Sequence, residues 1–231
     1  HFTNPIWLMQ KGGWESDLAP VLFERFTEVI VRQLGDLVDY WVTLNEPNVY
    51  ILTGYVSGDF PPGIKEPNKA AKVLANLIKG HGKAYRLIHR FFPNAQVGFA
   101  HSMRSFSPYR WWHPLDRMAA SYVGHFWNNQ ILDAMKTGTI EFRIPFAFHY
   151  KEEVEGLKNS LDFIGINYYS RDYISFSLKS EHKFDIVPDL NAPRTDMNWE
   201  IFPQGMYDAT MLAGSYGVPI YITENGLADA A

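Results

Sequence analysis

Four short runs along the chain are almost continuously apolar and rich in β-branched or aromatic side chains, a pattern that predicts β-strands. They span residues 38–44, 95–100, 161–168 and 218–223. Strands that are apolar at nearly every position are typical of a parallel sheet covered on both faces. We therefore expect these runs to be strands of one parallel sheet.

The segments between the runs carry apolar residues at intervals of three and four, the spacing of one helix face. These helical patterns cover about residues 22–34, 73–91, 115–135 and 205–216. Pro114 supplies a start signal for the third pattern, whereas Gly80 and Gly82 weaken the middle of the second. Strands that alternate with helices predict βαβ units, arranged either as a doubly wound sheet or as a (β/α) barrel.

Polar side chains follow each predicted strand at its carboxyl end. They are Asn45 and Glu46, His101 and Ser102, Asn167 and Tyr169, and Glu224 and Asn225. Several strands that deliver polar groups to one rim are typical of a barrel, whose catalytic face lies at the strand carboxyl ends. The glycine-rich phosphate turn of a dinucleotide fold is absent, which also favours the barrel. We predict a single domain over residues 1–231.

Charge and composition exclude several classes of function. Lys and Arg number 21 against 25 Asp and Glu, so no basic surplus exists to neutralise phosphates, and we expect no nucleic-acid partner. Cations are scattered and no apolar run approaches the length of a membrane helix, so we expect no membrane partner. The chain has no cysteine, which excludes disulfides and thiolate metal sites. His and carboxylates lack ligand spacing, so we expect neither a metal nor another cofactor.

Aromatic residues make up 16% of the chain, an excess that a packed core or a sugar-binding pocket explains. Trp111, Trp112 and His113 form the densest group. They suggest a platform for a bound ligand, but a loop packed against its own barrel is the favoured interpretation. Trp199 and His101 are interpreted as packed structural side chains.

Glu46 and Glu224 are each placed where an apolar strand ends, next to an Asn. Glycoside hydrolysis uses two carboxyl groups, one protonated to help the leaving oxygen depart and one ionised. Retention of configuration requires the two groups to lie about 5–5.5 Å apart, so that the second attacks the sugar itself. Both residues are therefore candidates for this chemistry.

The motifs around these residues resemble those of glycoside hydrolase family 1. Thr43-Leu44-Asn45-Glu46-Pro47 resembles the family's acid/base motif, and Ile222-Thr223-Glu224-Asn225-Gly226 resembles its nucleophile motif. Further similarity covers residues 1–5, 12–14, 54–63, 162–169 and 198–205, so it extends over essentially the whole chain.

The resemblance implies a (β/α)8 TIM barrel and retaining hydrolysis of terminal β-D-glycosidic bonds by double displacement. It implies that Glu46 is the acid/base and Glu224 the nucleophile, and that Tyr169 hydrogen-bonds Glu224. His1, Asn45 and Asn167 are the remaining implied substrate-binding residues, with Asn45 donating to the sugar's 2-hydroxyl. The implied substrate is a small β-glycoside or oligosaccharide. Glucose, galactose, fucose and 6-phospho-sugars all remain open.

The chain is short for this family, since a typical (β/α)8 barrel takes about 250 residues or more. By motif, its strands correspond to the fourth through seventh, plus the end of the third, so we expect an incomplete barrel. A longer polypeptide is the favoured reason for the missing strands. The alternatives are strands supplied by another chain, including a homo-oligomer, and an inactive fragment or carbohydrate-binding relative. No secretion signal is visible, so the cytoplasm is the default location.

Overall fold

The computed structural model describes residues 2–144, 148–180 and 182–229. The chain divides into two compact units, which are described separately. Unit 1 comprises His1–Ser102 and Ile131–Gly165, and unit 2 comprises Met103–Gln130 and Ile166–Ala231.

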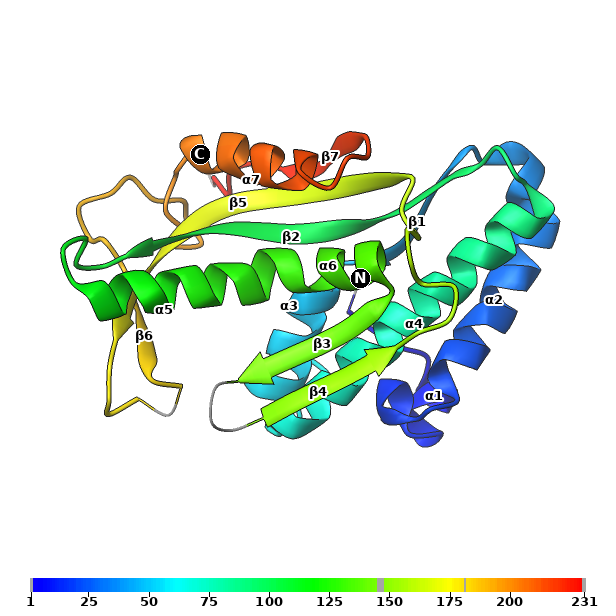
Figure 1. Cartoon of the computed structure of the whole chain (residues 1–231), viewed down its shortest axis with the longest axis horizontal. Helices are drawn as coiled ribbons and strands as arrows, with labels where there is room; N and C mark the ends of the chain where they lie inside the picture. The colour runs from blue at the N-terminus through cyan, green and yellow to red at the C-terminus, as the bar shows by residue number, and fades with distance from the viewer. Residues whose placement is uncertain (1, 145–147, 181, 230–231) are drawn as a thin grey trace. The chain divides into compact units, whose positions relative to one another are not determined.

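All four predicted strands are present, as β1 (Tyr40–Asn45), β2 (Gln96–Pro108), β5 (Phe163–Phe176) and β7 (Ile220–Asn225) (Figure 1). The sheet order is β1-β2-β5-β6, with β7 also paired to β5. β1 and β2 are parallel, as expected, with Trp41 opposite Val97. This arrangement of strands, with helices between them in sequence, is part of a (β/α)8 barrel.

β2 and β5 are longer than their apolar runs, because pairing continues past the point where the apolar pattern stops. The last part of β5 pairs antiparallel with β6 (Phe184–Val187), so its extended backbone has hydrogen-bond partners that the sequence pattern does not reveal.

The expectation that every strand is covered on both faces is wrong for β1 and β7. Tyr40 is 55% exposed and Val42 is 48% exposed on β1, and Ile222 is 50% exposed on β7. Within the described residues each of these strands pairs with a single neighbour, so each forms an edge.

The helical patterns correspond to α2 (Ala19–Leu34), α4 (Pro67–Phe91) and α7 (Gln204–Gly214), whereas the third is divided into three helices. Those three are α5 (Pro114–Gly124), the π-helix η4 (His125–Asn129) and α6 (Gln130–Thr137). Gly80 and Gly82 do not break α4. A Cβ at Gly80 would lie 3.2 Å from the Trp14 ring, and one at Gly82 would lie 3.2 Å from Leu157, so these glycines allow close packing.

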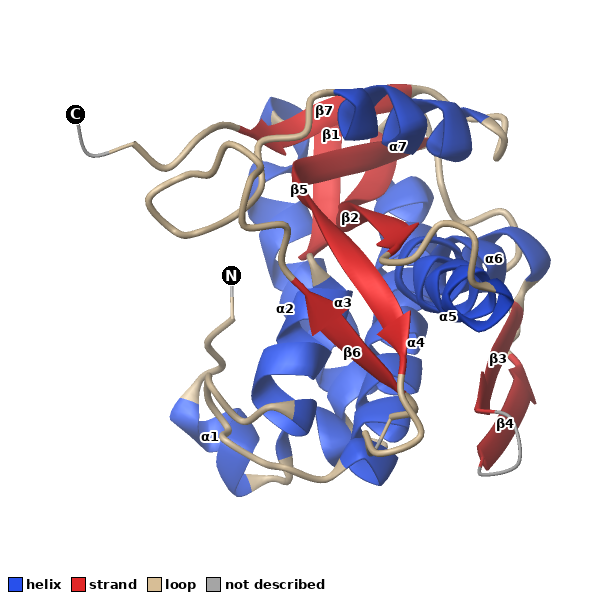
Figure 2. Cartoon of the chain, turned by 90° about the vertical axis from the view of Figure 1, so that its left-hand side faces the viewer, coloured by secondary structure: helices blue, strands red, loops and turns tan. Residues whose placement is uncertain are grey.

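Several short elements were not predicted. They are α1 (Ile6–Gln10), η1 (Gly13–Glu15), η2 (Gly35–Leu37), α3 (Pro47–Ile51), η3 (Leu52–Val56), β3 (Thr139–Ile144) and β4 (Phe148–Glu153). β3 and β4 pair antiparallel and form a separate two-stranded sheet (Figure 2). None of the helices in the described part of the chain has the length and apolar character needed to cross a membrane.

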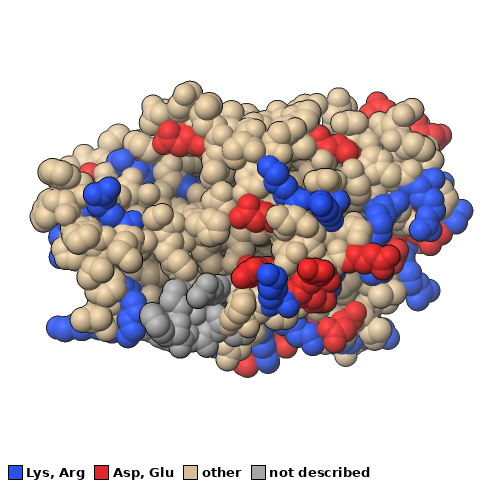
Figure 3. Space-filling model, viewed as in Figure 1, with Lys and Arg blue, Asp and Glu red and all other residues tan. Residues whose placement is uncertain are grey.

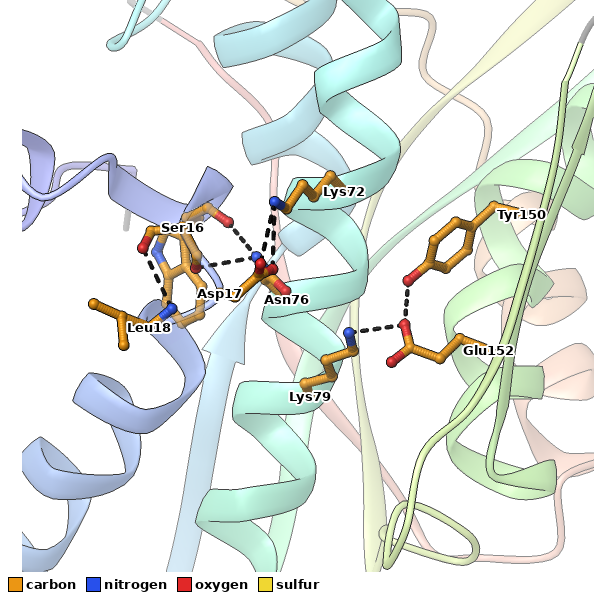
Figure 4. A network of polar contacts seen from close by, with 9 residues as sticks. Ser16, Asp17, Leu18, Lys72, Asn76, Lys79, Tyr150 and Glu152 are labelled. Carbon is orange, nitrogen blue, oxygen red and sulfur yellow. Dashed lines mark hydrogen bonds and ion pairs between the residues drawn. The ribbon is translucent and has the colours of Figure 1, made fainter.

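Polar contacts attach the unpredicted elements of unit 1 to α4 (Figure 4). The Lys79 ammonium lies 2.7 Å from the Glu152 carboxylate of β4. On another side of the helix, the Asn76 amide donates to the backbone carbonyls of Trp14, at 2.8 Å, and Ser16, at 3.2 Å. α4 therefore anchors both the η1 region and the hairpin through hydrogen bonds between segments far apart in sequence.

Candidate active site

Glu46 directly follows β1 in unit 1 and is only 8% exposed. Its backbone is left-handed, with φ 45° and ψ 56°. Its N–H donates to the Ala100 carbonyl at 2.8 Å, and its own carbonyl accepts from the Tyr50 N–H at 3.0 Å. A non-glycine residue held in this region costs about 1–3 kcal/mol, and such residues cluster at functional sites. The local backbone therefore favours a functional role for Glu46.

Side chains on both sides of Glu46 are hydrogen-bonded within unit 1. The Asn48 amide donates to the Ser102 carbonyl at 2.8 Å, which attaches the start of α3 to β2. Before Glu46, the Thr43 hydroxyl lies 2.6 Å from Nδ1 of the fully buried His81. Burial lowers the pKa of His81 to about 4, so the ring is neutral at pH 7. These contacts position the end of β1, and hence the Glu46 backbone.

Glu224 lies near the carboxyl end of β7 in unit 2. The Tyr169 hydroxyl donates to its Oε2 at 2.6 Å, so the hydrogen bond expected from the motif is present. The Trp199 ring packs against Tyr169, with 5.5 Å between ring centroids. The hydrogen bond and the packed ring fix the direction of the Tyr169 hydroxyl and of the Glu224 carboxyl group.

Two further contacts connect β7 to β5 beside Glu224. The Thr223 hydroxyl donates to Oδ1 of the fully buried Asn167 at 2.6 Å. The Asn225 amide donates to the Tyr168 carbonyl, also at 2.6 Å. Sequence reasoning did not assign roles to Thr223 or Asn225, although their positions on either side of Glu224 were a usable signal.

Two ion pairs lie near Trp199 in unit 2. The Arg104 guanidinium is 3.0 Å from the Asp172 carboxylate and 6.0 Å from the Trp199 ring centroid. Arg171 pairs with the buried Glu200. Burial raises the pKa of Asp172, partly offset by Arg104. These residues line a hollow of about 130 Å³. Trp199 therefore packs on one side, as interpreted, and borders a charged hollow as well.

The other sequence candidates have different outcomes. His1 lies outside the described residues. Asn45 is the last residue of β1, half-buried and paired with Ala100. His101 is fully buried, in keeping with its interpretation as a structural side chain. The packing interpretation is wrong for Trp111 and Trp112, which are 76% and 64% exposed.

Within the described ranges, no group of three or more His, Asp or Glu side chains is arranged to hold a metal ion. The side chains on or directly after β1, β5 and β7 include carboxyl groups, amides and a phenol. In (β/α)8 barrels the carboxyl ends of the strands form the face where catalytic side chains lie. The fold and these side chains therefore place the chain in the class of (β/α)8 barrel proteins.

Comparison with known proteins identifies the family. The chain matches the family described as glycosyl hydrolase family 1 over residues 1–231, and it belongs to that family. It is 33% identical to β-glucosidase A of Acetivibrio thermocellus, with 99% of this chain and 53% of that protein covered. It is 29% identical to a β-galactosidase of Pyrococcus woesei, with 100% of this chain and 52% of that protein covered.

A solved structure agrees with these relatives. The β-glycosidase from Pyrococcus horikoshii matches with a TM-score of 0.89 and 34% identity, covering 100% of this chain and 52% of that one. The chain therefore spans about half the length of the relatives that it matches.

Proposed function

We propose that the full-length protein is a retaining β-glycosidase that hydrolyses terminal β-D-glycosidic bonds. The observation that carries the proposal is the 2.6 Å hydrogen bond from the Tyr169 hydroxyl to Glu224, in a chain of glycosyl hydrolase family 1. A phenol that donates to a carboxyl group fixes the direction of its oxygens, which is a requirement of a carboxylate nucleophile.

In the proposed first step, a Glu224 oxygen attacks the anomeric carbon while Glu46 gives its proton to the departing glycosidic oxygen. The sugar is then held on Glu224 as an ester. In the second step, Glu46 takes a proton from water, and the resulting hydroxide displaces Glu224 to restore the β-configuration. The mechanism requires the two carboxyl groups to be about 5–5.5 Å apart in the active protein.

Asn45, Asn167 and His1 are proposed to bind the sugar's hydroxyl groups. Asn45 directly precedes Glu46, so a hydrogen bond to the 2-hydroxyl would form beside the reacting centre and strengthen in the transition state. The matched relatives include a β-glucosidase and a β-galactosidase, so both sugars are candidate substrates. The proposed substrate is a small β-glycoside, and the proposed location of the protein is the cytoplasm.

The test is a trapping experiment on the full-length protein. A 2-deoxy-2-fluoro-β-glycoside with a good leaving group should add one sugar per protein, and peptide mapping should place it on Glu224. Glu224→Gln should give no adduct, whereas Glu28→Gln, which changes an exposed glutamate of α2, should be labelled like the unsubstituted protein.

Glu46→Gln separates the two steps. With an activated aryl glycoside it should still form the glycosyl–enzyme, because a good leaving group needs little protonation, but it should release the sugar slowly. A label on any residue other than Glu224 contradicts the proposed nucleophile. Saturable sugar binding with neither turnover nor adduct would instead support a carbohydrate-binding relative.

A further inference from the structure

Three consecutive residues of β7, at positions 223–225, form side-chain hydrogen bonds with β5 in unit 2. Successive side chains of a strand ordinarily point to opposite faces of a sheet. Bonds from three residues in a row to one neighbouring strand are therefore more than the regular pleat supplies. The middle bond, between Tyr169 and Glu224, belongs to the proposed reaction, whereas the two-carboxylate mechanism leaves the outer two bonds without a role.

The two outer bonds hold the residues on either side of Glu224. The Thr223 hydroxyl donates to Oδ1 of Asn167 at 2.6 Å. The Asn225 amide donates to the backbone carbonyl of Tyr168, also at 2.6 Å. The Asn167 side chain is fully buried and the second acceptor is part of the β5 backbone, so both acceptors are fixed in place. Glu224 is therefore attached to β5 through both of its neighbours and not only through its own carboxyl group.

The strand that receives the outer bonds also carries the phenol that contacts the carboxyl group. Tyr169 follows Tyr168 directly and lies two residues after Asn167, so the three bonding partners move together as parts of β5. β7 ends at Asn225, and residues 226–229 form no regular secondary structure. The outer bonds thus fix the end of β7 relative to the Tyr169 hydroxyl at the point where the strand itself stops.

A hollow of about 380 Å³ in unit 1, beside α4, is a weaker candidate for a new role. Cations and carboxylates both line it, and they form ion pairs. Lys79 lies 2.7 Å from Glu152, and Lys83 lies 2.9 Å from Glu24. Figure 3 shows basic and acidic side chains beside one another on one face of the molecule, in keeping with such pairs. The hollow therefore has no single sign of charge that would select a ligand.

We propose that Thr223 and Asn225 are positioning residues, which hold Glu224 at the distance and in the direction from which it attacks the sugar. This inference rests on the proposed function, because it takes Glu224 as the nucleophile. A nucleophile must come within about 3–3.5 Å of the atom that it attacks, and a misplacement of about 1 Å can slow such a step roughly a hundredfold. Neither positioning residue touches the sugar. Loss of one outer bond should therefore slow the attack without weakening sugar binding.

The test is the rate at which the full-length protein is labelled by a dinitrophenyl 2-deoxy-2-fluoro-β-D-glucoside, or by the matching galactoside. In this step a Glu224 oxygen bonds to the anomeric carbon, and the dinitrophenolate leaves with the electron pair of the bond that breaks. Thr223→Val keeps the shape of the side chain but lacks the hydroxyl, so it should be labelled on Glu224 about tenfold more slowly. Thr223→Ser keeps the hydroxyl and should be labelled within about threefold of the unsubstituted rate.

The extent of labelling separates a positioning role from a loss of folding. A partly unfolded variant gives less label at an unchanged rate, whereas a misplaced nucleophile gives full labelling at a lower rate. The half-saturating concentration of the glycoside should change by less than about threefold. Thr210→Val removes a hydroxyl that donates to the Met206 carbonyl within α7 at 2.8 Å, so it is the matched control and should be labelled at the unsubstituted rate. Asn225→Ala is an independent variant and should slow labelling by a similar factor to Thr223→Val.

The outcomes distinguish this inference from the function on which it rests. If the unsubstituted protein is neither labelled nor able to hydrolyse aryl glycosides, the proposed function is contradicted and the positioning role falls with it. Labelling of Thr223→Val and Asn225→Ala at the unsubstituted rate overturns the positioning role alone, as does an equal loss of rate in Thr223→Ser. Slow but complete labelling in both variants, with the rate restored in Thr223→Ser, supports the proposal.

Discussion

Replacing His81 by glutamine tests how the buried polar contacts of α4 support β1. The Ser160 carbonyl lies 2.6 Å from Nε2 and can only accept, so Nε2 carries the proton. In the neutral ring Nδ1 then accepts from the Thr43 hydroxyl, also at 2.6 Å. Burial is the main cause that lowers the pKa of His81, from 6.5 to about 4.

The lowered pKa makes stability depend on pH in a defined direction. The unfolded chain binds a proton at His81 below about pH 6.5, whereas the folded chain resists it until about pH 4. The neutral ring therefore makes its full contribution to the free energy of unfolding above about pH 6.5. This contribution is lost as the pH falls to about 4. At roughly 1.4 kcal/mol for each pH unit between the two pKa values, the loss is about 3 kcal/mol by pH 4 and about 2 kcal/mol by pH 5.

The assay is urea unfolding of the full-length protein at about pH 7.5 and about pH 5. His81→Gln should be less stable at the higher pH by about 1–3 kcal/mol, since its partners lose well-placed hydrogen bonds. Its free energy of unfolding should then fall less on acidification, by about 2 kcal/mol, than that of the unsubstituted protein. His182→Gln, at an exposed position, serves as the control and should behave like the unsubstituted protein. Equal losses in His81→Gln and in the unsubstituted protein would refute the reasoning.

Three further predictions concern the site and its support. Tyr169→Phe removes the hydroxyl that donates to Glu224, so kcat should fall about tenfold or more while the protein stays folded. An unchanged kcat would contradict the role of this bond. Gly98→Ala places a Cβ 2.4 Å from a β5 carbonyl and should lower the free energy of unfolding in urea by about 1–3 kcal/mol. Gly214→Ala, whose Cβ would have its nearest neighbour at 3.8 Å, is the control and should not destabilise the protein. Equal effects of the two substitutions would refute the close approach at Gly98. Asp116→Asn removes the charge of a buried carboxylate that pairs with the partly exposed Arg110, and it should cost about 1–3 kcal/mol at pH 7. Because the pKa of Asp116 is lowered, chiefly by its hydrogen bond from an arginine, the difference should shrink as the pH falls below about 4, and a constant difference would argue against the pair.

The sequence predicted the elements whose pattern reflects burial along a single strand or helix. β1, β2, β5 and β7 were recognisable because apolar side chains fill nearly every position of each run. The β3–β4 hairpin was not predicted, although Ile140 and Phe142 alternate with polar residues in the pattern of a half-buried strand, because the four predicted strands rest on continuous apolar runs. Its attachment to α4, by contacts such as that of Lys79 with Glu152, could not be read from the sequence. An ion pair of this kind leaves no periodic signal in the sequence.

The sequence by itself determined where Glu46 and Glu224 would lie, since a polar residue after an apolar strand reaches the rim of a parallel sheet. It also determined the family, through the residues around both glutamates. Only the tertiary structure decided the left-handed backbone of Glu46 and the outward position of Trp111 and Trp112. The reason is physical: burial periodicity is local, whereas a strained backbone, a hydrogen bond between strands and an exposed ring depend on neighbours distant in the chain.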